Sequence, residues 1–286
     1  MEINDDRLRN WFGLFLKHKK YLCNAAPKTL LWYNHAFKNW EKAGCKDLSK
    51  TSIDQFVMSM VERGMEPGGA NIHITAMNSF FRWLFDQELA PSHYKIKRLK
   101  PLKKIQPSYT ESELTEIIGY KPKRWWEARI HTLLLFLIDT GCRVNEAITL
   151  TRDRVDLDSL AVKVTGKGSK ERIVPISLEL RKALFKFLQG HEHDLVFASK
   201  QGKKWDYQNV MRALDLLCKR VGVQAKGMHA FRRSFATMYV KEGGNLFYLQ
   251  AHLGHERLET TRRYVRVDQE ELQRVHMKSS PLSRLK

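Results

Sequence analysis

A strongly basic segment with two prolines constrains the fold of this chain most. Residues 94–107 read YKIKRLKPLKKIQP and hold six basic residues, no acidic residue, and prolines at positions 101 and 107. Proline fixes its φ angle and lacks an amide donor, so this stretch opposes a regular helix or strand. We expect an interdomain linker over residues 95–107, between a domain at 1–94 and a second at 108–286.

The residues before this segment follow a helical pattern. Apolar side chains recur at spacings of three and four from Leu8, Ile53 and Ile74, and residues 28–42 form a fourth such stretch. Turns that contain glycine separate the four stretches. The pattern predicts a four-helix domain, and we interpret its many aromatic side chains as core residues without a functional role.

After the linker the hydrophobic period changes from helix to strand and back. A capping box that begins at Thr110 precedes a short helix, and an apolar helix is expected over residues 127–139. Alternation in residues 160–164 and 172–176 predicts a β-hairpin. Further helices are expected at 178–188, 207–221, 230–241, 246–253 and 259–265. The fold class is therefore mainly α, with a small antiparallel β-sheet in the second domain.

The charge of the chain favours a polyanionic partner. Fifty Lys and Arg against 31 Asp and Glu give a formal net charge of +19 at pH 7. Nucleic acid is the first candidate and an anionic membrane surface the second. The longest apolar run, residues 133–138, is too short to span a membrane, and no signal peptide is recognised. The four cysteines show no C-x-x-C spacing, which favours a reduced, cytoplasmic setting. With DNA as the expected partner, the location is expected to be nucleoid-associated.

The basic residues of the linker are candidate DNA contacts. A charged, extended strap can be a solvated connector, or it can follow the phosphates of a duplex. We favour the second interpretation and leave the first open. The candidate residues are Lys95, Lys97, Arg98, Lys100, Lys103 and Lys104.

Six polar residues of the second domain have the side chains that phosphodiester cleavage requires. Arginine, lysine and histidine bind a phosphate and neutralise the charge that develops when a hydroxyl attacks it. Tyrosine can supply that hydroxyl if nearby cations lower its pKa. No glycine-rich nucleotide cradle or acidic metal cluster accompanies them, which favours the phosphate of a polymer. The six are Arg143, Lys167, His229, Arg232, His255 and Tyr264.

The spacing of these residues adds weight to motifs that are weak alone. Arg143 and Glu146 are three residues apart, as are His229 and Arg232, so each pair can share one face of a helix. Both pairs stand at expected helix starts, where backbone amides favour an anion. Lys167 lies between two glycines at the expected hairpin turn.

A histidine-rich loop is the one rival for a metal site. His191-Glu192-His193-Asp194 has H-x-H spacing but no cysteine and no second carboxylate group at helical spacing. We interpret it as a solvated turn before a strand at residues 195–197. No metal or other cofactor is expected.

Together and in this order, the motifs resemble those of the tyrosine recombinase (phage integrase) family, in particular its compact Xer-like and transposon-resolvase-like members. TGCRVNE resembles the first arginine box, VTGKGSKERIVPI the lysine hairpin, HAFRRSFAT the H-x-x-R box, and LGHERLETTRRYVRV the box with the last histidine and the tyrosine. The first domain matches only in length, helicity and position, which implies a SAM-like core-binding domain. Cys142 and Arg233 depart from the residues usual at their positions.

The resemblance implies an active site without metal or ATP. Tyr264 would attack the scissile phosphate and form a 3′-phosphotyrosyl link, with Lys167 as general acid for the leaving 5′-oxygen and His229 assisting proton transfer. The phosphate would be bound by three residues and oriented by a fourth: Arg143, Arg232 and His255, with Glu146. It further implies a homotetramer that joins two inverted-repeat core sites through a Holliday junction, with the C-terminal tail docked on a neighbour.

Two other classes of function are weighed against this one. A sequence-specific DNA-binding protein without chemistry would not need all six active-site residue types. A metal-dependent nuclease would need a carboxylate cluster that the sequence does not show. The recognition sequence is left open, as is the outcome, whether integration, excision, inversion, cointegrate resolution or chromosome dimer resolution. The need for a partner recombinase or an accessory protein is also left open.

Overall fold

The computed structural model of the chain describes residues 3–101, 106–166, 168, 170–254, 273, 276–277 and 280. The chain forms two compact units, Met1–Ile105 and Gln106–Lys286. The division between them falls inside the segment expected as a linker. Among the described residues, no helix combines the length and the apolar character that a membrane crossing requires.

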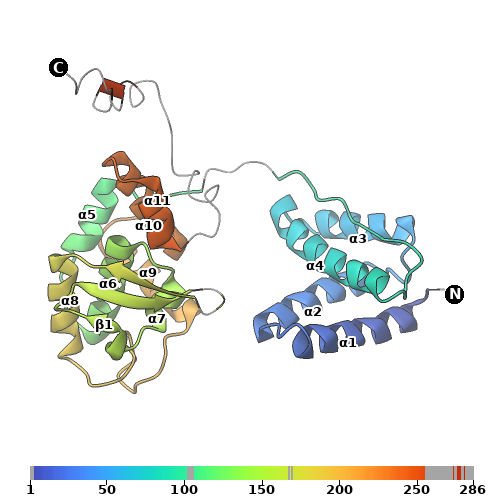
Figure 1. Cartoon of the computed structure of the whole chain (residues 1–286), viewed down its shortest axis with the longest axis horizontal. Coiled ribbons are helices and arrows are strands. Elements are labelled where there is room, and N and C mark those ends of the chain that lie inside the picture. Colours follow the sequence, from blue (N-terminus) through green and yellow to red (C-terminus); the bar gives the residue numbers. More distant parts are fainter. Residues whose placement is uncertain are drawn as a thin grey trace. The chain divides into compact units, whose positions relative to one another are not determined.

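Unit 1 is a bundle of four helices (Figure 1). Aromatic side chains make up much of its core. The Phe12 ring stacks on Phe37 at a centroid distance of 4.0 Å and meets Phe80 edge-on at 5.3 Å, so three helices share one cluster of rings. The helical periodicity of the sequence is thereby confirmed, and the aromatic residues are core residues. The helices are α1 (Asp5–Tyr21), α2 (Pro27–Lys42), α3 (Lys50–Glu62) and α4 (Pro67–Asp86).

The basic segment after α4 is fastened to unit 1 by two asparagines. The Asn78 side chain donates to the Ile96 carbonyl at 2.9 Å and accepts from the Ile96 amide at 2.7 Å. Asn71, two turns earlier on α4, makes the same pair of bonds to Leu99, at 2.8 and 2.9 Å. Ile96 is buried, whereas Lys95 and Lys97 on either side of it are exposed. The segment therefore has a fixed register on α4 with its lysines directed outward.

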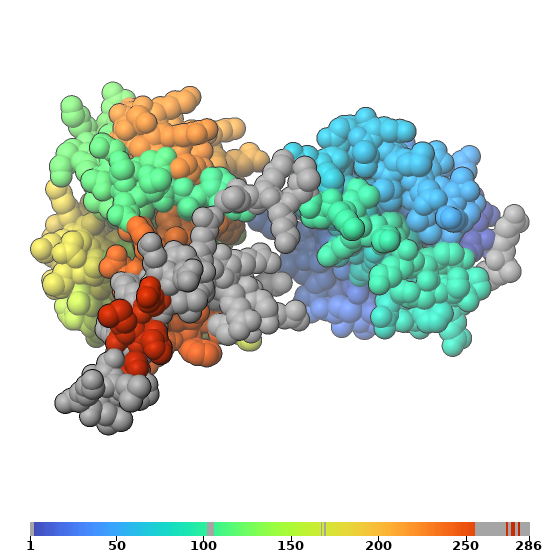
Figure 2. Space-filling model, turned by 90° about the horizontal axis from the view of Figure 1, so that it is seen from above, coloured from blue at the N-terminus to red at the C-terminus, as the bar shows by residue number. Residues whose placement is uncertain are grey.

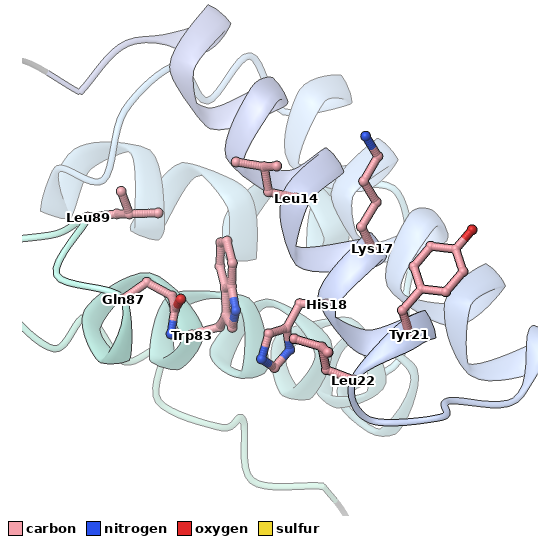
Figure 3. A pocket seen from close by; sticks show the side chains of 8 residues that line it. All are labelled: Leu14, Lys17, His18, Tyr21, Leu22, Trp83, Gln87 and Leu89. Atoms are coloured by element: carbon pink, nitrogen blue, oxygen red, sulfur yellow. The ribbon is translucent and has the colours of Figure 1, made fainter.

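A pocket on unit 1 lies between α1 and the end of α4 (Figure 3). The Trp83 side chain stands in the middle of the view, with His18 beside it at a ring-centroid distance of 6.0 Å. Leu14 and Lys17, which like His18 belong to α1, also line the pocket. None of the candidate catalytic residues belongs to this unit.

Unit 2 is built around α6, an apolar helix that α8, α9 and α10 pack against (Figure 1). Gly141 ends α6 in the left-handed region, and the capping box of Thr110 and Glu113 begins α5. The helices are α5 (Glu111–Gly119), α6 (Trp125–Thr140), α7 (Val144–Ile148), α8 (Leu178–Leu188), α9 (Tyr207–Arg220), α10 (Met228–Lys241) and α11 (Leu246–Leu253).

A three-stranded antiparallel sheet lies beside these helices. Its order is β1 (Val155–Asp156), β2 (Ala161–Thr165) and β3 (Glu171–Pro175), so the predicted hairpin is confirmed and one short strand is added. Val162 faces Val174 across the hairpin, and both side chains are buried. The sheet thus presents one apolar face to the core and places its β2–β3 turn at one end.

The expected strand at residues 195–197 is wrong. Only a single bridge between Thr151 and Leu195 forms there. The Phe197 carbonyl accepts two bonds from the Arg129 guanidinium, at 3.1 and 2.8 Å, and is therefore not available to a neighbouring strand. The helix expected at residues 259–265 lies outside the described residues.

Candidate active site

The turn between α6 and α7 holds Arg143 and Glu146 together. Arg143 is the N-cap of α7; its backbone amide donates to Glu146 Oε2 at 2.8 Å and its Nη1 donates to Oε1 at 2.9 Å. The Glu146 side chain is 4% exposed, whereas that of Arg143 is 34% exposed. The carboxylate therefore fixes the arginine from the protein side and leaves part of its guanidinium open to solvent.

Arg232 lies on α10 and connects the ends of two other helices. It is buried, and it donates to the Gly141 carbonyl at 3.0 Å and to the Leu253 carbonyl at 2.6 Å. These carbonyls belong to the C-terminal ends of α6 and α11, where the helix leaves its last acceptors without partners. The second arginine of the predicted site is therefore anchored beside the turn that carries the first.

His229 lies one turn before Arg232 on the same helix, and its side chain reaches solvent. Partial burial lowers its pKa from the usual range, and the charges of Arg232, Arg233 and Arg143 lower it further. The imidazole is therefore neutral at pH 7 and can accept a proton.

Arg172 belongs to this cluster, and the sequence reasoning gave it no role. Its Nη1 and Nη2 donate to Glu146 Oε1 and Oε2 at 3.0 and 2.8 Å, and its Nε donates to the His252 carbonyl at 2.7 Å. Strand alternation could have indicated a role for Arg172. It lies two residues before buried Val174 and therefore on the same, core-facing side of β3, where an arginine is unusual.

The environment of Glu146 keeps it ionised. Its burial opposes the charge, but hydrogen bonds from Arg172 and from the Arg143 amide outweigh that cost and hold its pKa below the usual range. Cys142, which directly precedes Arg143 in the α6–α7 turn, is buried, and burial raises the pKa of its thiol. A high pKa disfavours the reactive thiolate at this position.

Arg233, the other departure from the family pattern, fastens the entrance of unit 2 to α10. Its Nε and Nη2 donate to the Pro107 carbonyl at 2.9 and 2.5 Å. The next residue, Ser234, accepts from the Tyr109 amide at 2.8 Å and donates to the Tyr109 carbonyl at 2.9 Å. The chain therefore enters unit 2 directly on the helix that carries His229 and Arg232.

Three predicted catalytic residues, Lys167, His255 and Tyr264, lie outside the described residues, as do Lys103 and Lys104 of the basic segment. Their neighbours in the chain are described. A Cβ added to Gly166 would lie 3.5 Å from both Glu146 Oε1 and Arg172 Nη1. Gly254 ends α11 in the left-handed region, 3.3 Å from Arg172 on the same measure. Residues 167 and 255 thus directly follow two glycines that lie beside the cluster.

The histidine-rich loop is organised around an arginine. Arg152 donates to the carbonyls of Leu188 and His193 at 2.6 and 2.9 Å, and also to that of His191. The His191 Nε2 atom lies 3.1 Å from the Val196 carbonyl. Within the described part of the chain, no group of three or more His, Cys, Asp or Glu side chains is arranged for a metal ion.

The site motifs lie within a segment that matches a known family. The sequence profile of the phage integrase family matches residues 108–271, more than half of the chain. The chain belongs to the phage integrase family. By this membership it is a tyrosine-type recombinase.

Curated relatives of this family align with most of the chain. The tyrosine recombinase XerC of Thermodesulfovibrio yellowstonii is 29% identical over 94% of this chain and 96% of the relative. XerC of Rickettsia bellii is 29% identical over 83% and 78%, and XerD of Haemophilus ducreyi is 28% identical over 88% and 91%.

Solved structures of the family share the fold. The Tn1549 transposon integrase, in complex with a circular intermediate DNA, superposes with a TM-score of 0.78 at 16% identity, over 95% of this chain and 98% of that one. A lambda integrase dimer bound to a core site gives 0.75 at 16%, over 91% and 99%. The predicted fold class, mainly helical with a small antiparallel sheet, is confirmed.

Proposed function

We propose that this chain is a site-specific recombinase that cuts and rejoins DNA strands through a 3′-phosphotyrosyl intermediate and a Holliday junction, without metal or ATP. The observation that carries the proposal is the convergence of Arg143, Arg232 and His229 beside the α6–α7 turn. Two guanidinium groups and a neutral imidazole form a compact cationic site for a phosphodiester. Family membership supplies the reaction class.

In the proposed reaction the anchored arginines act by position and charge. Arg143 and Arg232 bind the non-bridging oxygens of the scissile phosphate, and Glu146 orients Arg143. Because these groups are held before the substrate binds, little reorganisation accompanies the transition state. Loss of one such donor typically lowers the rate by about 10² to 10³. His229, neutral at pH 7, assists proton transfer at the nucleophile.

The remaining steps rest on residues known only from the sequence. Tyr264 attacks the phosphorus, the bond to the 5′-oxygen breaks, and Lys167 donates a proton to that oxygen. His255 donates a hydrogen bond to a phosphoryl oxygen. The phosphotyrosyl bond retains the energy of the phosphodiester, so attack by a 5′-hydroxyl reverses the step without ATP.

The proposed partner is double-stranded DNA with an inverted-repeat core site, bound by a homotetramer on two sites. The solved Tn1549 integrase is in complex with a circular intermediate DNA and the lambda integrase dimer is bound to a core site, which supports DNA as the partner of this chain. In unit 1, three lysines of the basic segment are exposed and available for phosphates, namely Lys95, Lys97 and Lys100. Arg98 donates to the Thr75 hydroxyl at 2.7 Å and lies on the same segment. Lys103 and Lys104 are proposed contacts on the sequence alone.

Covalent trapping tests the proposal and finds the site. The full-length protein is incubated with a library of nicked duplexes of random sequence in EDTA, and DNA that remains attached to protein in detergent is sequenced. We expect adducts with the wild-type protein, none with Tyr264→Phe, and wild-type yield with Tyr248→Phe, which alters an exposed tyrosine of α11.

Two outcomes would contradict the proposal in different ways. An adduct that persists in Tyr264→Phe refutes the nucleophile. A wild-type protein that binds a defined duplex sequence but forms no adduct in any buffer is a DNA-binding protein without the chemistry.

A further inference from the structure

One arginine at the centre of the candidate site has no role in the proposed reaction. Arg172 touches Glu146 from β3 and the last turn of α11 through the His252 carbonyl. Its side chain is 13% exposed, so it is largely shielded from solvent. We propose that Arg172 is a positioning residue, which holds the Glu146 carboxylate in place while Arg143 binds the scissile phosphate. The inference rests on the proposed function.

The two arginines that contact Glu146 are held in different ways. Arg172 uses both terminal nitrogens and both carboxylate oxygens, which is the bidentate geometry that a planar guanidinium favours. The Arg143 side chain contacts Oε1 through one nitrogen and remains about one third exposed, and the Arg143 backbone amide contacts Oε2. When a phosphate draws on Arg143, Arg172 still satisfies the buried carboxylate. Without Arg172, Glu146 would depend on Arg143 alone.

The third bond of Arg172 extends this control to α11. Its Nε donates to the His252 carbonyl at 2.7 Å, and Arg232 donates to the next carbonyl, that of Leu253, at 2.6 Å. The last carbonyls of a helix have no partner within the helix, so these two bonds fix the end of α11 against the cluster. Arg172 lies in the hairpin motif itself, and it thereby connects the first arginine box, through Glu146, to His252, the residue directly before the motif that begins at Leu253.

Lysine is a poor substitute at this position. An ammonium group retains the charge but not the planar fork, and it cannot hold two carboxylate oxygens and a carbonyl in one plane. Arg172→Lys therefore separates charge from geometry, and Arg172→Gln removes both.

The first test is single-turnover cleavage at saturating protein, on a nicked duplex that carries the site recovered by trapping. We expect Arg172→Gln and Arg172→Lys to cleave about 10- to 100-fold more slowly than wild type, by analogy with the residues that orient metal ligands through a hydrogen bond. DNA affinity should be unchanged. The matched control is Arg154→Gln, since Arg154 pairs with Glu171 on the same sheet at 2.8 Å. Wild-type rates in both Arg172 variants would refute the inference.

The pH profile distinguishes positioning from a general loss of structure. The groups facing Glu146 are Arg143 from the start of α7, Arg172 from β3 and the Cys142 thiol from the turn. Without Arg172, burial raises the pKa of Glu146, so the carboxyl gains a proton at higher pH than in wild type. Cleavage by Arg172→Gln should therefore decline toward acid at a pH where the wild-type rate is still level. A profile parallel to that of wild type would refute the role.

A double-mutant cycle completes the test. In a Glu146→Gln background, Arg172→Gln should lower the cleavage rate much less than it does alone, because the two residues act as one unit. Additive effects would contradict the inference. If the wild-type protein forms no adduct, the proposed function fails. If wild type cleaves and the Arg172 variants match it, only this inference fails.

Discussion

Gly141, at the end of α6, offers a sharp test of how tightly the candidate site is packed. Its φ of +59° lies in the left-handed region, and its carbonyl accepts a hydrogen bond from Arg232. A Cβ at this position would lie 2.4 Å from Phe235 Cδ1 and 3.1 Å from Leu253 Cδ2. The first distance is far inside van der Waals contact and involves a ring carbon. Gly141→Ala must therefore move the α6–α7 turn, the Phe235 ring, or both.

The expected cost follows from two separable contributions. A left-handed conformation costs a residue with a Cβ about 1 to 2 kcal/mol. Added volume in a packed core costs about 1 to 3 kcal/mol more. Gly222→Ala is the matched control, because Gly222 has a φ of +72° and nothing within 4 Å of an added Cβ. We expect a loss of about 2 to 5 kcal/mol for Gly141→Ala and about 1 to 2 kcal/mol for Gly222→Ala.

Native-state hydrogen exchange of the full chain measures these losses directly. Peptides from α6 and α9 report the free energy of opening of unit 2 without a contribution from unit 1. The trapping assay, performed at a temperature where both variants are folded, should show a larger loss of adduct formation for Gly141→Ala, because its carbonyl anchors Arg232. Equal destabilisation of the two variants would refute the packing argument. Equal adduct yields would refute the link from Gly141 to Arg232.

Two further predictions concern charges outside the catalytic cluster. Hydrogen bonds led by the Lys123 amide lower the pKa of Glu127 to about 2, so this ionised carboxylate stabilises the fold above its unfolded pKa, and the contribution is lost as pH falls toward about 2. Glu127→Gln should therefore unfold at lower denaturant concentration at pH 7, with a difference that shrinks below about pH 4.5; a pH-independent difference would contradict this. For DNA binding, the double variant Lys95→Gln/Lys97→Gln should reduce the slope of log affinity against log salt by about 1.8, whereas Lys182→Gln on α8 should leave it unchanged. An unchanged slope in the double variant would remove these lysines from the interface.

Local patterns in the sequence predicted most of the secondary structure. Residues 178–188 and 246–253 were expected as helices and form α8 and α11 with these bounds, because apolar periodicity and capping residues act over a few positions. The strand expected at residues 195–197 failed because Arg129, far away in sequence, takes the Phe197 carbonyl. Periodicity carries no information about a partner at that distance.

The candidate site was predictable to a similar extent. The spacing of Arg143 to Glu146 and of His229 to Arg232 already implied shared helix faces. The role of Arg172 was not predicted, because its three acceptors belong to Glu146 and His252, which are 26 and 80 residues away, and only the fold brings them together. Nothing in the sequence indicated that the basic segment, expected as a linker, is bound to α4. The hydrogen bonds from Asn71 and Asn78 that hold it join residues 28 and 18 positions apart, which a local pattern does not reveal. The roles of Lys167, His255 and Tyr264 stay predictions.

The binding of the basic segment to α4 determines where two such proteins can be joined to make a chimaera. A chimaera that exchanges unit 1 to change sequence preference would naturally be joined at residue 94, the end of the first domain expected from the sequence. If residues 1–94 of this chain are joined to another recombinase there, Asn71 and Asn78 must bond to the backbone of the other protein. The buried position of Ile96 would then also hold a side chain from the other protein. A junction between Pro101 and Gln106 instead transfers the basic segment together with α4, the helix that binds it. It also leaves Pro107 with its own Arg233, so each module retains the contacts that define its end.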